Sequence, residues 1–192
     1  MAQLYFHYAS MNAGKSTHLL SVAHNYKERG MQTLIMKPEV DTRDSKSEVV
    51  SRIGLSAPAV PITEGMNLVE YFRYAMSVQD IHCVLVDEAQ FLKSEHIYEL
   101  SEIVDKFNCP VICYGLRTDF RGELFEGAKA LFQAADKLVE MKGVCHCGRK
   151  ATMVARIDKD GNAVTDGPQV EMGGEDRYVS LCRKHWKEKV NL

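Results

Sequence analysis

The sequence lacks the features of a secreted or membrane-spanning chain. Its first residues, Met1 to Tyr8, have neither the basic segment nor the small-residue cleavage site of a secretory signal, and no apolar stretch approaches bilayer-spanning length. Charge of one sign is not in excess either, since 24 Lys and Arg face 26 Asp and Glu. Duplex nucleic acid is bound largely by clustered cations, so it is not expected as the main partner. These absences predict a cytoplasmic protein that binds neither membranes nor nucleic acid.

A disulfide framework is not expected, although cysteine occurs six times, because thiols stay reduced in the cytoplasm. Cys83, Cys109 and Cys113 lie in or beside apolar runs and are interpreted as buried, inert thiols. The other three cysteines gather near the C-terminus, where a role as metal ligands is favoured.

The first two thirds of the chain alternate short apolar runs with longer amphipathic ones, a pattern typical of βαβ units. Right-handed crossovers would then place helices on both faces of one parallel sheet, so the predicted fold class is α/β. Strands are expected at about 3–8, 33–37, 82–87, 111–116 and 137–142. Helices are expected at about 15–29, 67–77 and 94–107. Residues 38–58 are polar without a sustained period and are interpreted as a long loop.

The composition of the sequence changes near residue 143, where cysteines, glycines and short β-like runs begin. A hairpin is expected in this part, built from 151–158 and a turn at Asp160-Gly161. We therefore predict two domains, a nucleotide-binding domain over residues 1–143 and a small C-terminal domain over residues 144–192.

A phosphate-binding loop is predicted directly after the first strand, in the run Ala9-Ser10-Met11-Asn12-Ala13-Gly14-Lys15-Ser16. In this Walker A arrangement, backbone N–H groups and a helix N-terminus point at phosphate oxygens. Lys15 would reach the β and γ phosphates of ATP, and the Ser16 hydroxyl would bind Mg²⁺. Ala9 stands where the pattern has its first glycine, and alanine enters a left-handed conformation only at a cost.

Two carboxylates, Asp87 and Glu88, end the apolar run 83–86 in the form of a Walker B motif. Such a strand lies close to the phosphate loop, at the carboxyl edge where doubly wound sheets bind ligands. Asp87 would orient Mg²⁺, directly or through water. Glu88 is the candidate base that accepts the proton of an acceptor hydroxyl during phosphoryl transfer. The two motifs, in this order, predict a P-loop kinase or ATPase.

A zinc site is predicted from Cys145, Cys147, Cys182 and His185. The second pair has the common two-residue spacer, whereas the single residue between Cys145 and Cys147 is tighter than usual. His146 is a competing ligand by its position. Four protein ligands leave no open coordination position, so the Zn²⁺ is expected to be structural.

Three runs make the chain similar to the zinc-containing, RecA-like (type II) thymidine kinases: Asp87-Glu88-Ala89-Gln90-Phe91, Tyr114-Gly115-Leu116-Arg117-Thr118-Asp119-Phe120-Arg121 and Arg177-Tyr178-Val179-Ser180-Leu181-Cys182-Arg183. The likeness extends from the first strand to about residue 186. It implies a RecA-like core that transfers the γ-phosphate of ATP to the 5′-hydroxyl of thymidine. It also implies a homotetramer and a zinc-anchored "lasso" loop, spanning about 155–178, that closes over the base.

The resemblance also implies the roles of individual residues. Glu88 would be the proton acceptor, while Lys15, Ser16 and Asp87 would serve phosphate and magnesium, with Ala89 and Gln90 in the same nucleotide-binding run. Arg43, in Asp41-Thr42-Arg43, would help to neutralise the transferring charge, and a solvated loop cation is the alternative. The nucleoside pocket would be walled by Met11, Leu116, Phe120, Phe125 and Tyr178. For the aromatic members, plain core packing is the alternative.

Two other function classes fit parts of the pattern. A P-loop ATPase with a zinc ribbon that acts on nucleic acid would also carry an Asp-Glu-Ala-Gln run. Against it stand the slightly negative charge and the lack of an arginine-rich stripe or a second motor domain. The other class is a regulatory nucleotide-binding module without turnover.

Overall fold

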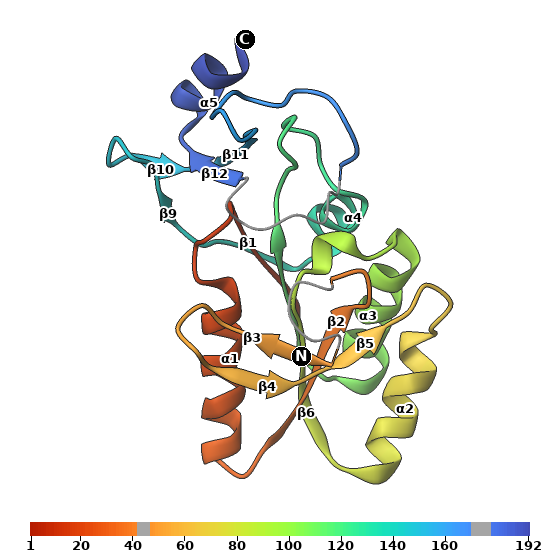
Figure 1. Cartoon of the computed structure of the whole chain (residues 1–192). Coiled ribbons are helices and arrows are strands. Elements are labelled where there is room, and N and C mark those ends of the chain that lie inside the picture. The colour runs from red at the N-terminus through yellow and green to blue at the C-terminus, as the bar shows by residue number, and fades with distance from the viewer. Residues whose placement is uncertain (42–46, 170–177) are drawn as a thin grey trace.

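The centre of the molecule is a six-stranded sheet, seen edge-on in the computed structural model, which describes residues 1–41, 47–169 and 178–192 (Figure 1). The strand order is β5-β2-β6-β7-β1-β8, and every neighbouring pair is parallel. The α/β fold class is therefore confirmed. In chain order the strands are β1 (Leu4–Ala9), β2 (Gln32–Pro38), β5 (Val60–Ile62), β6 (Ile81–Val86), β7 (Val111–Leu116) and β8 (Lys137–Glu140).

Apolar layers cover both faces of this sheet, as the right-handed crossovers predict. On one face, Leu19 and Leu20 of α1 (Lys15–Glu28) pack with the hairpin of β3 (Glu48–Val50) and β4 (Ser56–Pro58). The larger core lies on the opposite face, between the sheet and three helices (Figure 1). These helices are α2 (Leu68–Val78), α3 (Ser94–Phe107) and α4 (Glu126–Ala134).

Local sequence signals explain where several helices begin and end. Asn67 caps α2, since its side chain accepts a hydrogen bond from Glu70 N at 2.8 Å. Gly30 follows the end of α1 with φ of 73°, and Asn108 ends α3 with φ of 51°. Both residue types tolerate the left-handed conformation that closes a helix, so these boundaries agree with the sequence-based prediction.

The interpretation of residues 38–58 as one long loop is wrong in part. The hairpin β3–β4 lies within this stretch, and β5 follows directly. Each of these strands is three residues long, too short to show a period in the sequence. Helix α4 was likewise not predicted. Residues 42–46, with Arg43 among them, lie outside the described residues.

The C-terminal part consists of short antiparallel pairs and one helix. These elements are β9 (Gly143–Val144), β10 (Lys150–Ala151), β11 (Met153–Arg156), β12 (Tyr178–Leu181) and α5 (Arg183–Val190). The predicted turn at Asp160-Gly161 is present, because Gly161 has φ of 82° and its N–H donates to Asp158 O. The predicted hairpin is present only next to the turn, where Ile157 and Ala163 form an isolated antiparallel bridge and Val164 N donates to Arg156 O. The strand β11 itself pairs with the distant β12, which was not predicted.

Two hydrogen bonds join this part to the loop after β1. Ser10 Oγ donates to Ala151 O at 3.2 Å, and Ser180 Oγ donates to Met11 O at 2.7 Å. The short C-terminal sheets therefore stand over the carboxyl edge of the main sheet (Figure 1). Across residues 1–41, 47–169 and 178–192, every helix is too short or too polar to cross a membrane.

Candidate active site

The loop between β1 and α1 has the backbone geometry of a phosphate cradle. Gly14 caps α1 with φ of 78° and Asn12 has φ of 63°, so two residues of the loop are left-handed. Ala9 is the last residue of β1, where it pairs with Leu116, and its φ is not positive. The alanine in place of the first glycine is therefore accommodated without strain at that position.

Lys15 and Ser16 open α1 at the mouth of this cradle. Lys15 is 7% exposed, and its Nζ donates to Ser10 O at 3.1 Å, within the loop itself. Ser16 Oγ donates to Asp87 Oδ2 at 2.8 Å, although 71 residues separate them in the sequence. The predicted meeting of the phosphate loop and the acidic pair is thus present, with β7 lying between their strands β1 and β6.

The two carboxylates of the acidic pair are buried beside each other. Asp87 is 5% exposed and Glu88 is 7% exposed. Burial, and after it the neighbouring Glu88 charge, raise the pKa of Asp87 to about 6. Two adjacent buried carboxylates repel each other, so this site favours a cation held by oxygen ligands. Mg²⁺ fits this donor set, and Ser16 and Asp87 are the residues that would hold it.

Glu88 is held in an unusual backbone conformation at the turn that follows β6. Its φ is 48°, in the left-handed region, and its side chain accepts a hydrogen bond from Gln90 Nε2. The other end of the Gln90 amide accepts from Leu116 N at 3.0 Å, so Gln90 ties Glu88 to the end of β7. A Cβ atom at Gly115 would lie 2.8 Å from Gln90 Oε1, so this contact requires a glycine there. Ala89 and Gln90 belong to the short helix η1 (Ala89–Phe91) and are themselves buried.

The residues assigned to a nucleoside pocket all come from segments at the carboxyl edge. Leu116 ends β7 and is half-buried, and Met11 in the cradle is bonded through its carbonyl to Ser180 of β12. Tyr178 begins β12 and is half-buried. Phe125 is 5% exposed, and its ring meets Phe91 edge-on with centroids 5.5 Å apart. For Phe125 the packing contact is therefore explicit, whereas its substrate contact stays a prediction.

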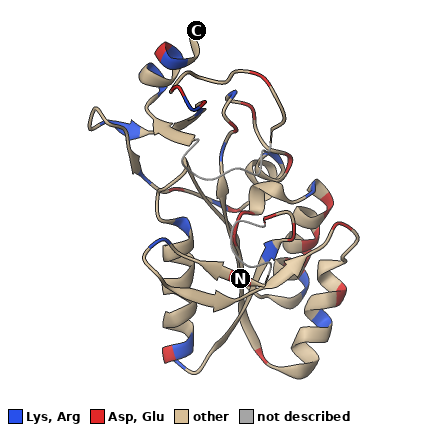
Figure 2. Cartoon of the chain, viewed as in Figure 1, with Lys and Arg blue, Asp and Glu red and all other residues tan. Residues whose placement is uncertain are grey.

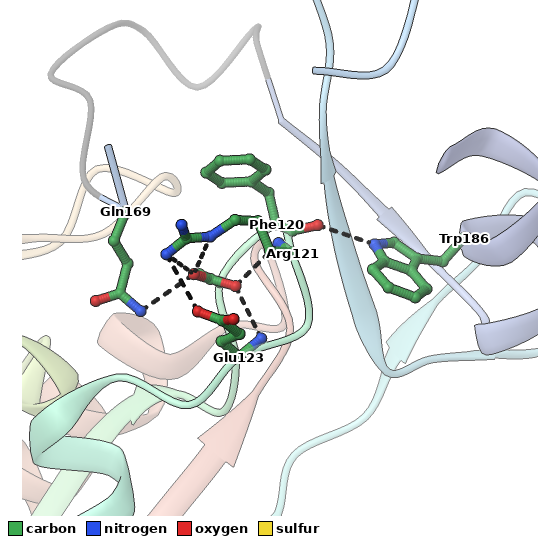
Figure 3. A network of polar contacts seen from close by, with 6 residues as sticks. Phe120, Arg121, Glu123, Gln169 and Trp186 are labelled. Atoms are coloured by element: carbon green, nitrogen blue, oxygen red, sulfur yellow. Dashed lines mark hydrogen bonds and ion pairs between the residues drawn. The ribbon is translucent and has the colours of Figure 1, made fainter. Parts of the chain in front are cut away.

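Phe120 lies in a turn that is fixed by the carboxylate of Asp119 (Figure 3). Asp119 accepts hydrogen bonds from the backbone of Arg121 and Glu123, from the Arg121 guanidinium, and from Gln169 Nε2 at 3.1 Å. The guanidinium of Arg156 stands 5.4 Å from the centroid of the Phe120 ring. No sequence pattern predicted this network, apart from the position of Asp119 in the run that resembles thymidine kinases.

Cys145, Cys147, Cys182 and His185 come together as predicted, with ligand atoms all within 4.8 Å of one another. Each of Cys145 Sγ and Cys182 Sγ lies 3.4 Å from His185 Nδ1, and Cys147 Sγ lies 3.9 Å from Cys182 Sγ. A tetrahedral zinc with Zn–S bonds of about 2.3 Å sets its sulfurs about 3.8 Å apart. The four residues therefore fit Zn²⁺, despite the single residue between the first two cysteines.

The neighbours of the cluster support this set of ligands. His146 is not one of the four grouped residues, and its ring stacks on that of His185 with centroids 4.3 Å apart. On the other side of the His185 ring, Nε2 lies 3.8 Å from the carboxylate oxygen Oε2 of Glu188. A carboxylate on the second ring nitrogen fixes the orientation of a metal-bound histidine. His146 thus lies beside the four grouped residues, with its Nδ1 3.7 Å from Cys145 Sγ.

A buried ion pair near the carboxyl end of β2 was not anticipated. Lys37 Nζ lies 3.1 Å from Asp41 Oδ2, with side chains 2% and 7% exposed, and Lys37 also donates to Glu48 O. The pair fixes the chain just ahead of residue 42. A lysine at the end of an apolar strand carries no sequence signal for burial, because lysine is usually exposed.

Comparison with known proteins points to one family. A family model described as "Thymidine kinase" matches residues 2–186. The thymidine kinase of Enterobacteria phage T4 is 60% identical over 188 residues, which cover 98% of this chain and 97% of the phage protein. The thymidine kinase of Salmonella paratyphi A is 56% identical, covering 99% and 93% of the two chains. That of Escherichia coli K12 is 55% identical, covering 100% and 94%.

Proposed function

The chain belongs to the thymidine kinase family, and we propose how its residues carry out the reaction of that family. It phosphorylates the 5′-hydroxyl of thymidine with ATP as the phosphoryl donor. The observation that supports our assignment of roles most strongly is the hydrogen bond between Ser16 and Asp87. It brings the phosphate cradle and the acidic pair to one edge of the sheet, with Glu88 adjacent to the place where the γ-phosphate would lie.

The cradle, from Ala9 to Ser16, would bind the phosphates of ATP. Backbone N–H groups around Gly14 and the N-terminus of α1 supply partial positive charge without any reorganisation. Lys15 would exchange its contact with Ser10 O for phosphate oxygens, which are stronger acceptors because they are charged. Mg²⁺, when bound, neutralises charge on the β and γ phosphates.

Glu88 would serve as the base. Phosphoryl transfer to an alcohol needs a group that orients the hydroxyl and accepts its proton. The bond from Gln90 and the left-handed backbone fix the direction of the Glu88 carboxylate before substrate arrives. Ala89 and Gln90 would thus contribute to the nucleotide site through the shape of the turn. Arg43 would add positive charge near the phosphates.

The nucleoside pocket is proposed to be walled by Met11, Leu116, Phe120, Phe125 and Tyr178. A thymine ring and its methyl group require apolar and aromatic contacts, and a backbone-lined loop can match the polar edge of the base. Residues of about 155–178 would form this loop, anchored by structural zinc on Cys145, Cys147, Cys182 and His185. The division into domains at residue 143 belongs to the same proposal.

The charge distribution favours a small-molecule substrate over nucleic acid. Lys and Arg alternate with Asp and Glu over most of the ribbon, although the short helix α5 carries four basic residues and one Glu (Figure 2). All six cysteines are free, which is compatible with a reducing cytoplasm. We further propose a homotetramer, on the basis of the family resemblance.

A nucleoside panel tests the assignment. Purified protein is incubated with ATP and magnesium together with thymidine, deoxyuridine, deoxycytidine, deoxyadenosine or deoxyguanosine, and nucleoside monophosphate and ADP are quantified. We expect ADP release that depends on thymidine and matches thymidine monophosphate one to one. ADP release that is stimulated by single-stranded DNA, without a phosphorylated nucleoside, would instead indicate a motor ATPase.

A further inference from the structure

Trp186 connects the zinc-binding cluster to the turn that carries Phe120. It is the one tryptophan of the chain, it follows His185 on α5, and it is 6% exposed. Its Nε1–H is shared between two carbonyl oxygens, Phe120 O at 3.2 Å and Val154 O at 3.0 Å. Figure 3 shows the indole facing the Phe120 carbonyl, while the Phe120 ring points away from it.

The indole also determines the shape of that turn by contact. A Cβ atom at Gly122 would lie 3.3 Å from Trp186 Cη2, and Gly122 has φ of 84°. The Gly122 N–H donates to Asp119 O, which closes the turn around Phe120. A side chain at position 122 would therefore press on the tryptophan ring and on Met153 Cε, which lies equally close.

On its other side, Trp186 is attached to the metal ligands. Its backbone N–H donates to Cys182 O at 2.9 Å, in the first turn of α5. Its side chain shares a buried apolar cluster with Cys145 and Cys182. A zinc ion held by Cys182 and His185 would fix both ends of this turn and, through it, the position of the indole.

We infer that Trp186 is a positioning residue, which transmits the order of the zinc site to Phe120 and so sets the affinity for the nucleoside. The inference rests on the proposed function, because it takes Phe120 as a wall of the nucleoside pocket. Phe120 is held from three directions: by Trp186 at its carbonyl, by the Asp119 network in its turn, and by Arg156 at its ring. Among these, the contact with Trp186 is the one that reaches the metal ligands.

The test uses the variant Trp186→Phe, which keeps an aromatic ring but removes the N–H donor. We expect the KM for thymidine to rise roughly 3- to 10-fold, the scale of one or two buried hydrogen bonds. The kcat and the KM for ATP should change less than about twofold, and zinc content should stay at one per chain. Val190→Ala, which trims a half-buried residue packed on the same cluster, serves as the control for general loosening. An unchanged thymidine KM in zinc-loaded Trp186→Phe would overturn the inference.

A second measurement needs no substitution, because Trp186 is its own fluorescent reporter. Excitation at the red edge of tryptophan absorption avoids the tyrosines. In the native enzyme, thymidine should change the emission saturably, with a midpoint near its KM. Chelation of zinc should abolish this change, and a thymidine response that persists unaltered in zinc-free protein contradicts the inference. If the native enzyme does not phosphorylate thymidine at all, the proposed function fails instead.

Discussion

The side-chain amide of Gln90 donates a hydrogen bond to Glu88 Oε2 and accepts one from Leu116 N. Gln90 is 1% exposed, so both ends of the amide are used inside the protein. The contact crosses from the turn after β6 to the end of β7. It therefore fixes the proposed base relative to a proposed wall of the nucleoside pocket.

Replacing Gln90 tests this contact. Gln90→Leu removes the donor to Glu88 and leaves Leu116 N unpaired, so we expect kcat to fall ~10-fold while the KM for ATP stays within about twofold. Stability should fall by roughly 1–3 kcal/mol. Gln79→Leu, at an exposed glutamine that ends α2, is the matched control. A kcat equal to that of the control would show that the orientation of Glu88 does not depend on Gln90.

Glu88→Gln tests the base itself. The substitution keeps the size of the side chain but removes the proton acceptor, so phosphorylation of thymidine should fall at least ~10²-fold. Binding of an ATP analogue, measured by calorimetry, should remain nearly intact. Unchanged turnover would remove Glu88 from its proposed role.

Asp87→Asn should separate stability from activity. Because its pKa is raised from 3.8 to about 6, ionised Asp87 lowers the stability of the magnesium-free fold above that pH. At neutral pH, without nucleotide, the variant should be more stable than the parent by on the order of 2 kcal/mol. Its magnesium-dependent activity should nevertheless drop at least ~10²-fold. A less stable variant in denaturant titrations would contradict the proposed repulsion with Glu88.

The zinc ligands can be tested against a buried cysteine outside the cluster. Cys182→Ser should lower zinc content, measured by elemental analysis, and lower the melting temperature, because the free energy of zinc binding is also folding free energy. Cys109→Ala is the control, since Cys109 is 5% exposed and lies at the far end of the sheet, ahead of β7. Equal zinc content in parent and Cys182→Ser would refute the assignment.

His7 should make the fold sensitive to acid. Burial, and after it the nearby His18, lower the pKa of His7 from 6.5 to about 4. The rings of Tyr5, His18 and Tyr114 lie next to the His7 ring. The folded chain binds this proton less readily than the unfolded chain. The contribution of neutral His7 to the free energy of unfolding is therefore fully present above pH 6.5 and is lost as the pH falls towards 4.

Replacing His7 should remove part of that loss. In His7→Phe, we expect the stability lost between these pH values to shrink by on the order of 1 kcal/mol, a figure discounted for a half-exposed ring. Denaturant unfolding at several pH values measures it. His24→Gln, at an exposed histidine of α1, should behave like the parent. Parallel pH curves for parent and His7→Phe would contradict the assignment.

The features that were predicted well from the sequence depend on contiguous runs of residues. The cradle needs a strand, a glycine and a helix start in succession, and the acidic pair needs an apolar strand before it. Both lie where the pattern placed them, because their geometry is determined within about ten residues. The grouping of Cys145, Cys147, Cys182 and His185 was also predicted, since the residue types alone restrict the chemistry.

The features that were missed depend on distant contacts. Gly127 is the second residue of α4, and although glycine has a low helix propensity, a Cβ there would lie 2.4 Å from Ala89 O. Close packing of η1 on α4 therefore outweighs local propensity. Likewise, the turn at Asp160-Gly161 brings only Ile157 and Ala163 together as a local antiparallel bridge, while β11 finds its partner strand in β12. Such pairings carry no signal in the residues between them.

The hydrogen bonds from Ser180 to Met11 and from Ser10 to Ala151 bear on how the protein is made. A chain leaves the ribosome N-terminus first, so the cradle emerges early and its two supports emerge late. Ser180 follows Met11 by 169 residues in the chain. The nascent protein accordingly supports this loop from both sides only after β12 has emerged, and a truncated product that ends before β12 would carry an unsupported cradle.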